Sequence, residues 1–164
     1  MKAIVLTERG RLEMQEVPRP EPRPGQVRVR TAACGICATD LEMIAGDDRV
    51  TRPAVLGHEW AGYVDAAGSP GDVGLVGKPC VAENVLPGGG EVGFEHPGGY
   101  GEFLVTEAAN VHVVPDNLPM PVAALVVAHR ERVQPRHPPV DQRQHVAGVR
   151  CAEDLMPAAD DVDR

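Results

Sequence analysis

Hydrophobic positions in this chain occur in short runs, and several of these runs alternate with polar positions. Residues 27–30 read Val-Arg-Val-Arg, a period of two that is typical of a half-buried strand. Gly10-Arg11 can turn a first strand back onto a second. The runs that predict strands are residues 2–6, 12–17, 26–31, 60–66, 78–85, 100–106 and 111–114. The pattern therefore predicts a mainly β fold.

Proline and glycine mark the breaks between these runs. Proline occupies every second position from 18 to 24, and because it has no amide hydrogen this segment is predicted to be an extended connector. Thr39 is predicted to cap a short helix over residues 40–45, which Gly46 can end. The apolar residues 119–127 predict the start of another helix.

The character of the sequence changes near residue 127. Residues 130–145 are rich in Arg, Gln, Pro and His without any period, and the last residues are mostly acidic. Such a segment buries too little apolar surface to offset its chain entropy. We therefore predict one domain over residues 1–127, followed by an irregular or disordered tail over residues 128–164. A chain of 164 residues is long enough for one core of that kind.

Composition narrows the possible partners and compartments. A formal net charge of −8 argues against nucleic acid and against an anionic membrane surface. No apolar run approaches the length of a membrane span, and residues 1–8 are too short and too soon charged for a secretory signal. We therefore expect a cytoplasmic protein. Its 4 cysteines fit metal binding better than a disulfide framework.

Residues 33–62 carry the strongest chemical signal. Cys37 offers a thiolate, His58 an imidazole and Glu59 a carboxylate, which together make an incomplete tetrahedral zinc set. A catalytic zinc needs one open position for water or substrate. Asp40 could accept the far ring proton of His58, which would fix its tautomer. The hydroxyl of Thr39 could pass a proton between an alcohol at the metal and solvent.

Other interpretations of these residues exist. The Cys34-x-x-Cys37 spacing also occurs in redox pairs and in halves of zinc knuckles, although no second pair of this spacing is present. Cys34 alone is best interpreted as a small buried residue. A His-Glu dipeptide on its own is common on protein surfaces. Its weight here comes from the sequence Gly-His-Glu-x-x-Gly that follows a Cys-x-Thr-Asp.

Three segments resemble the catalytic domain of the zinc-dependent medium-chain alcohol dehydrogenases. They read Ala-Cys-Gly-Ile-Cys-Ala-Thr-Asp-Leu, Pro-Ala-Val-Leu-Gly-His-Glu-Trp-Ala-Gly and Gly-Gly-Tyr-Gly-Glu-Phe-Leu-Val. The resemblance runs from residue 1 to about residue 126. It implies a GroES-like β-barrel with short helices. It also implies that Cys37 and His58 are zinc ligands, that Glu59 is a ligand or near-ligand, and that Thr39 begins a proton relay. Some members have a histidine where this chain has Glu42.

The chain departs from that family in three places. Residues 84–99 contain no cysteine, where many members bind a structural zinc; Cys80 is interpreted as a strand residue. The Glu-Pro-Leu segment that supplies a further ligand in polyol-type members is replaced by Val-Ala-His, and a solvated histidine is a better interpretation of His129 than a substitute ligand. No Gly-x-Gly-x-x-Gly occurs, so we expect no complete Rossmann domain, and Gly88-Gly89-Gly90 lacks the strand-to-helix context of a phosphate loop.

The resemblance implies a fragment of a zinc-dependent, NAD(P)-linked alcohol or polyol dehydrogenase, which oxidises a small-molecule alcohol to a carbonyl compound. One catalytic zinc is expected, and NAD(P) would belong to the missing cofactor domain, so the chain is expected to be inactive alone. Two alternatives stay open: a catalytically dead GroES-like binding module, and a small protein that binds zinc structurally through Cys34, Cys37 and His58. The abrupt change near residue 127 suggests a frameshift or truncation. The sequence does not predict the oligomeric state.

Overall fold

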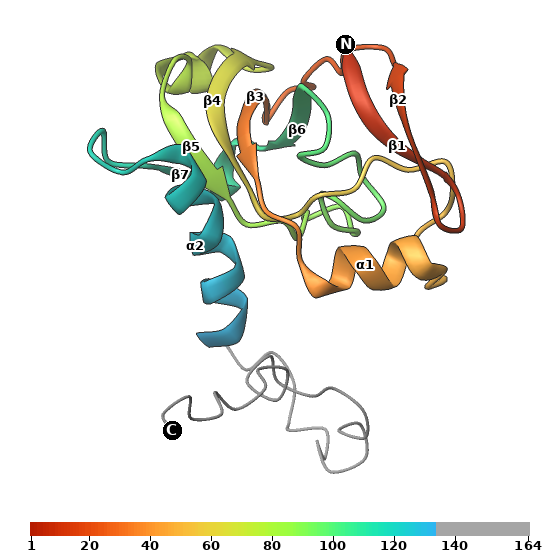
Figure 1. Cartoon of the computed structure of the whole chain (residues 1–164). Helices are drawn as coiled ribbons and strands as arrows, with labels where there is room; N and C mark the ends of the chain where they lie inside the picture. Colours follow the sequence, from red (N-terminus) through yellow and green to blue (C-terminus); the bar gives the residue numbers. More distant parts are fainter. Residues whose placement is uncertain (134–164) are drawn as a thin grey trace, which may run out of the picture. The chain divides into compact units, whose positions relative to one another are not determined.

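The computed structural model describes residues 1–133, with side chains through residue 126 (Figure 1). Most of the regular structure in this part is β. The elements are β1 (Lys2–Glu8), β2 (Arg11–Glu16), β3 (Gln26–Cys34), α1 (Ala38–Ala45), β4 (Trp60–Ala67), β5 (Pro79–Ala82), β6 (Phe103–Glu107), β7 (Val111–Val113) and α2 (Met120–Val133), with two short 3₁₀ helices at Pro70–Leu75 and Ala108–Asn110. The predicted mainly β fold is therefore confirmed.

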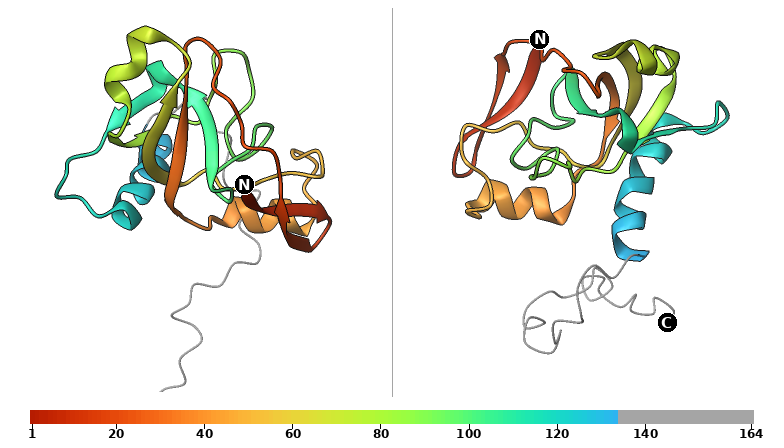
Figure 2. Two further views of the ribbon diagram at one scale, coloured as in Figure 1. Left: turned by 90° about the horizontal axis from the view of Figure 1, so that it is seen from above. Right: turned by 180° about the vertical axis from the view of Figure 1, so that it is seen from behind.

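The strands form two antiparallel sheets. The larger sheet has the order β6-β3-β4-β5-β7, and β1 pairs only with β2. Isolated bridges from Ala3 to Gly101 and from Leu6 to Ala54 connect the hairpin to the loops beside the large sheet (Figure 2). In the part of the chain that the structure describes, the two sheets do not close into one continuous hydrogen-bonded barrel.

Apolar side chains of the described residues form several separate clusters, three of which lie around the strands and helices that carry the site. Val27, Val29, Trp60 and Leu104 pack together inside the large sheet. Ala123 and Ala124 of α2 cover another part of that sheet, where they pack with Ala61 and Val81. Met43 of α1 packs with Leu6, Val50 and Leu56. These regions anchor both ends of the segment that the sequence singled out, residues 33–62.

Arg28 is an exception to the alternation in β3. Its neighbours Val27 and Val29 face the core as expected, but Arg28 is buried as well. The proline-rich connector passes over it, so that its guanidinium donates to the backbone oxygen of Pro20 at 3.2 Å and to Glu21 at 2.7 Å. On β4, Asp65 accepts a further hydrogen bond at 2.7 Å. One cation therefore ties the connector to two strands.

Replacing Arg28 with methionine is expected to lower the free energy of unfolding by about 1–3 kcal/mol. Methionine keeps an apolar side chain of similar length, but the carboxylates of Asp65 and Glu21 lose their partner. Because these side chains are 30% and 72% exposed, water can solvate the carboxylates and limits the loss of stability. Urea unfolding followed by the fluorescence of Trp60, the single tryptophan, measures the free energy of unfolding of the wild type and the variant. The matched control is Arg30→Met on the same strand, where the arginine is exposed. Equal losses in both variants would contradict this assignment.

Several element ends differ by a few residues from the sequence-based expectation, and two of these differences have a visible cause. The cap of α1 is Cys37 and not Thr39, because the amide of Cys37 bonds the side chain of Asp40 in a capping box. Strand β5 ends at Ala82 and not at residue 85, because the next carbonyl groups turn away from the ladder. The carbonyl oxygens of residues 83 and 85 accept hydrogen bonds from the side chain of Asn110. The carbonyl oxygen of Asn84 accepts a hydrogen bond from the amide of Val92.

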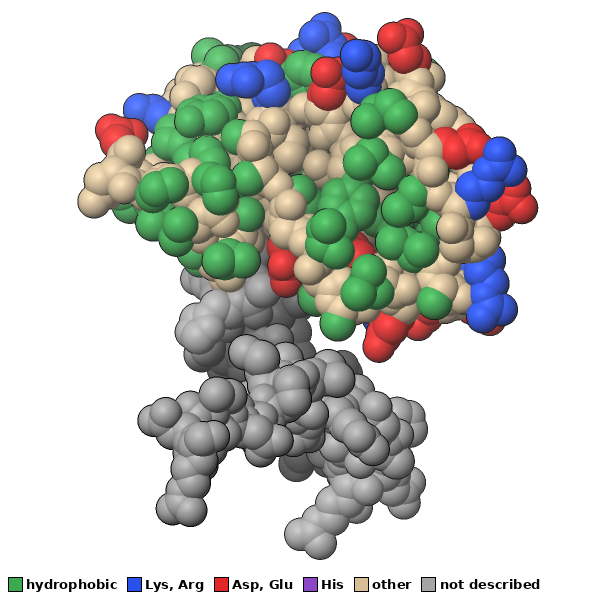
Figure 3. Space-filling model, in the orientation of Figure 1, with side chains coloured by type: hydrophobic (Ala, Val, Ile, Leu, Met, Phe, Trp, Pro, Cys, Tyr) green, Lys and Arg blue, Asp and Glu red, His purple; other side chains and the backbone are tan. Residues whose placement is uncertain are grey.

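Helix α2 runs past the predicted domain boundary between residues 127 and 128. The remainder of the predicted tail, residues 134–164, lies outside the described residues, so that boundary stays a prediction. Neither α1 nor α2, as far as the structure describes them, combines the length and the apolar character that a bilayer crossing requires. Figure 3 shows one face of the molecule, where hydrophobic side chains occupy the middle and most charged side chains lie toward the edge.

Candidate metal centre

Two neighbouring strands bring the predicted metal ligands together. Strand β3 ends at Cys34 and leads to Cys37, while His58 and Glu59 directly precede β4. Cys34 is the register partner of Trp60, so the end of β3 and the start of β4 lie side by side. The ligand atoms of Cys37, His58 and Glu59 all lie within 4.8 Å of one another. Within the described residues, no other group of three His, Cys, Asp or Glu side chains is so arranged.

Cys37 is held by the start of α1. Its backbone is extended, with φ −90° and ψ 159°, and its amide donates to Asp40 Oδ2 at 2.7 Å. The amide of Asp40 in turn donates to the carbonyl oxygen of Cys37 at 3.1 Å. These two bonds fix the backbone from which the thiol projects. They also use one carboxylate oxygen of Asp40 and leave the other for a different partner.

That other oxygen faces His58. Asp40 is fully buried, and its Oδ1 lies 3.5 Å from Nδ1 of His58. Neither atom has a hydrogen bond that meets geometric criteria in the described part of the chain, so a small closing movement would satisfy both. Burial lowers the pKa of His58, but the carboxylate of Asp40 and, after it, the side chain of Cys37 outweigh this effect and raise the pKa to about 9. The neighbours of the imidazole therefore favour its protonated form when no metal is bound.

Glycine makes room for the carboxylate of Glu59. The amide of Gly35 donates to the backbone oxygen of Glu59 at 2.7 Å. A Cβ atom on Gly35 would lie 2.5 Å from Oε2 of Glu59, so any larger residue there would displace the carboxylate. Glu59 itself is buried. Gly35 thus has a role that the spacing of the two cysteines did not reveal.

Thr39 and Glu42 lie on α1 beside the centre. The hydroxyl of Thr39 is 3.8 Å from the sulfur of Cys37, which places it next to the group of candidate ligands. Glu42 points elsewhere: its side chain is exposed and is 3.4 Å from the guanidinium of Arg49. Among these two side chains, only Thr39 is therefore close enough to act at the centre.

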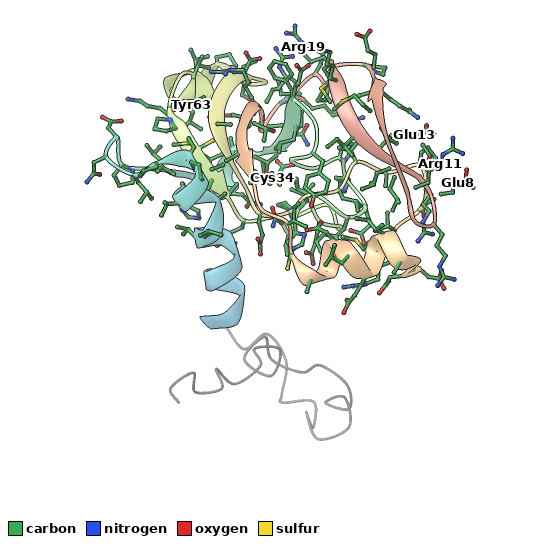
Figure 4. All side chains as sticks on the ribbon, viewed as in Figure 1. Glu8, Arg11, Glu13, Arg19, Cys34 and Tyr63 are labelled. Carbon is green, nitrogen blue, oxygen red and sulfur yellow. The ribbon has the colours of Figure 1, made fainter. Side chains whose placement is uncertain are left out.

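Cys34 and Cys80 are separate from the centre. Burial first, and then the negative charges of Asp40 and Glu59, raise the pKa of Cys34 to about 12, so it stays a neutral thiol. Figure 4 labels it at the end of β3 that leads to α1. Burial likewise raises the pKa of Cys80, on strand β5, to about 12. Neither residue belongs to the group whose ligand atoms converge, so both are structural thiols in the metal-free chain.

Sequence reasoning missed three residues around the centre. The ring of Phe94 lies on that of His58, with centroids 4.8 Å apart. Asn84 donates to the backbone oxygen of His58 at 2.7 Å. Tyr100 is packed beside Gly57, where an added Cβ would meet its ring at 2.6 Å. All three come from distant segments, so no local spacing could have indicated them. His129, the possible substitute ligand, has a side chain outside the described residues.

The donor set suits zinc. A thiolate, an imidazole and a carboxylate are the three side-chain types that bind this ion, at roughly 2.0–2.3 Å. The orphaned Nδ1 of His58 faces a buried carboxylate, which is the usual partner of a histidine that binds a metal through its other nitrogen. Three protein ligands leave a fourth position for a small molecule. The residues present therefore fit a catalytic rather than a closed structural site.

Comparison with known proteins identifies the family of the chain. Residues 23–116 match the family described as the alcohol dehydrogenase GroES-like domain. An alcohol dehydrogenase of Geobacillus stearothermophilus is 34% identical, over 78% of this chain and 44% of its own length. D-altritol 5-dehydrogenase of Agrobacterium fabrum is 33% identical, over 76% of this chain and 42% of its own. The chain thus spans less than half the length of these relatives.

Solved structures show the same partial coverage. Galactitol-1-phosphate dehydrogenase from Escherichia coli superposes with a TM-score of 0.69 and 27% identity, over 77% of this chain and 41% of its own. Acetophenone reductase from Geotrichum candidum, solved in complex with NAD, gives 0.71 and 28%, over 77% and 43%. The similarity in each case extends over most of the described residues.

Proposed function

This chain belongs to the family of the alcohol dehydrogenase GroES-like domain, and from that premise we propose that Cys37, His58 and Glu59 hold one catalytic zinc ion. The convergence of their ligand atoms within 4.8 Å carries the proposal. The reaction proposed is the oxidation of a small alcohol or polyol to a carbonyl compound, with NAD(P) as hydride acceptor. Relatives named as an alcohol dehydrogenase and a polyol dehydrogenase support that substrate class.

The residues around the centre have distinct proposed roles. A zinc ion held there lowers the pKa of an alcohol that it binds. Thr39, 3.8 Å from the sulfur of Cys37, receives the alcohol proton on its hydroxyl and passes its own proton on toward solvent. Asp40 holds the Nδ1 proton of His58, so that Nε2 keeps its lone pair for the metal. Phe94 shields one face of the imidazole from water.

Hydride transfer also needs a nicotinamide beside the alcohol, because positioning supplies much of the rate. Solved relatives hold NAD or NADP, and they are more than twice as long as the stretch matched here. In this proposal the described residues bind the metal and the alcohol, and they do not by themselves hold the nicotinamide. The convergence of Cys37 with His58 and Glu59, and not with Cys34, argues against the alternative of a structural zinc site made by Cys34, Cys37 and His58.

Titration of the metal-free chain with Co²⁺, a spectroscopic substitute for zinc, tests this proposal. We expect one equivalent to bind, with a thiolate-to-cobalt absorption band from Cys37 and the intense visible bands of a four-coordinate ion. Zinc should then displace the cobalt and remove both signals. Absence of binding in the folded chain, or a spectrum of six oxygen ligands without the thiolate band, would contradict the proposed centre.

A further inference from the structure

A single buried carboxamide contacts the residues on both sides of Glu59. Asn84 is 2% exposed and lies just beyond the end of β5 at Ala82, far in sequence from the ligands. Its Nδ2 donates to the backbone oxygen of His58 at 2.7 Å. Its Oδ1 accepts from the indole nitrogen of Trp60 at 3.2 Å. The first bond holds the backbone directly before Glu59, and the second ties the carboxamide to the side chain of the residue directly after it.

The chemistry of the two partners fixes which way the amide points. An indole N–H can only donate and a backbone carbonyl can only accept. Asn84 therefore presents its oxygen to Trp60 and its nitrogen to His58, and a flipped amide would lose both bonds. Asparagine is well suited to this task, because it carries a donor and an acceptor on one short, planar group.

Asn84 is itself held in place by its surroundings. Its backbone oxygen accepts from the amide of Val92 at 3.0 Å. The side chain of Asn110 donates to the backbone oxygens of residues 83 and 85, at 3.1 and 2.9 Å. Because of these hydrogen bonds, the chain beyond Ala82 does not continue the strand. The carboxamide of Asn84 therefore projects from a backbone that is held on both sides.

We propose that Asn84 is a positioning residue for the metal centre. It holds the carbonyl of His58 so that the imidazole of His58 and the carboxylate of Glu59 meet the thiol of Cys37. Without its Nδ2, the buried carbonyl has no donor and the dipeptide can rotate away from α1. This inference rests on the proposed zinc site, but it concerns a residue that contributes no atom to the ligand group.

The test uses the full chain with Asn84→Leu, which has nearly the same size and keeps neither hydrogen bond. We expect Co²⁺ affinity to fall by about 10- to 100-fold, the range seen when partners of metal ligands are removed. The thiolate-to-cobalt band should weaken or shift, because Cys37 and His58 no longer converge. A second variant, Asn84→Ser, retains a small polar group and should give the same direction of change if the leucine variant does not fold.

Two controls separate positioning from general loosening. Trp60→Phe removes the other bond of the carboxamide and shortens a fully buried ring, and Asn110→Ala removes the two bonds that flank residue 84. Both controls keep the bond from Nδ2 of Asn84 to the carbonyl of His58, so we expect a much smaller loss of Co²⁺ affinity in each than in Asn84→Leu. If Asn110→Ala loses affinity as strongly as Asn84→Leu, or if a folded Asn84 variant binds as the wild type does, the inference is overturned.

A metal-free measurement keeps this inference distinct from the proposed function. The amide of Gly35 donates to the backbone oxygen of Glu59, so its hydrogen exchange reports on the order of the dipeptide. Exchange at Gly35 should be about tenfold faster in Asn84→Leu and much less accelerated in the two controls, which keep the bond to the carbonyl of His58. Failure of the wild type to bind cobalt would contradict the zinc proposal alone. Unchanged hydrogen exchange at Gly35 in Asn84→Leu would overturn the positioning role of Asn84, whether or not cobalt binds.

Discussion

Replacing Cys37 with serine is expected to lower the zinc affinity of the chain by more than about 100-fold. Removal of residues that only support metal ligands already reduces affinity by about 10–100-fold, and Cys37 is one of three direct candidates. A serine hydroxyl stays protonated near neutral pH and is a much poorer ligand than a thiolate. Competition with a chromophoric chelator measures the affinity of wild type and variant on the same scale.

Cys34→Ser is the matched control for this experiment. It makes the same chemical change three residues earlier, in a thiol whose pKa is raised to about 12 and which lies outside the ligand group. We expect it to retain wild-type zinc affinity. A large loss in Cys34→Ser, with little loss in Cys37→Ser, would exchange the roles of the two cysteines and favour a structural site in place of the proposed catalytic one.

Replacing Gly57 with alanine is expected to lower the free energy of unfolding by about 2–5 kcal/mol, a large share of the stability of an ordinary domain. Two costs combine. The backbone of Gly57 has φ +97°, which costs a residue with a Cβ about 1–2 kcal/mol. That Cβ would also lie 2.6 Å from the ring of Tyr100 and 2.8 Å from the sulfur of Cys34, and overpacking of this kind costs about 1–3 kcal/mol.

Gly10→Ala separates these two costs. Gly10 has φ +73°, but a Cβ added there would meet no atom within 4 Å. It should therefore show the backbone cost alone, about 1 kcal/mol, in urea unfolding followed by Trp60 fluorescence. Equal effects of the two substitutions would show that the space around Gly57 is not as tight as the structure indicates. Gly57 directly precedes His58, so the alanine variant should also bind cobalt more weakly.

The strands could be predicted because local alternation and turn residues determine them. Val27 and Val29 face the core as their spacing indicated, and Pro79 begins β5 as a residue without an amide hydrogen must. Strand ends were less predictable. Residues 83–85 were included in the predicted strand, but their carbonyl groups accept hydrogen bonds from Asn110 and Val92 outside the ladder. Those donors come from other parts of the chain.

The start of α1 shows how tertiary context can override propensity. Threonine is a better helix cap than cysteine in general, which favoured Thr39. The observed cap is Cys37, because the buried carboxylate of Asp40 bonds its amide. That choice follows from the environment of Asp40, which the sequence does not display. It also moves Thr39 into the first turn of the helix, beside the candidate ligands.

The metal centre was partly visible in the sequence. Cys37, His58 and Glu59 belong to residue types with known metal chemistry, and the structure brings their ligand atoms together; their roles as ligands stay a prediction until metal binding is measured. Gly35 and Asn84 were not identified. Glycine and asparagine are common in turns, so only the position of the Glu59 carboxylate and of the His58 carbonyl reveals what these two residues do.

The pairing of Cys34 with Trp60 determines where this domain can tolerate insertions and deletions. Because β3 and β4 deliver the two halves of the ligand group, the distance between those halves depends on strand register. The loop after α1 could gain or lose residues around its exposed positions 48 and 49, as related sequences diverge, without moving any ligand, whereas Val50 in the same loop is fixed in the core. One residue inserted into β3 next to Cys34 would shift Cys37 by about 3.3 Å and reverse the faces of the strand. Length variation should therefore accumulate in the loop and be excluded from the paired strands.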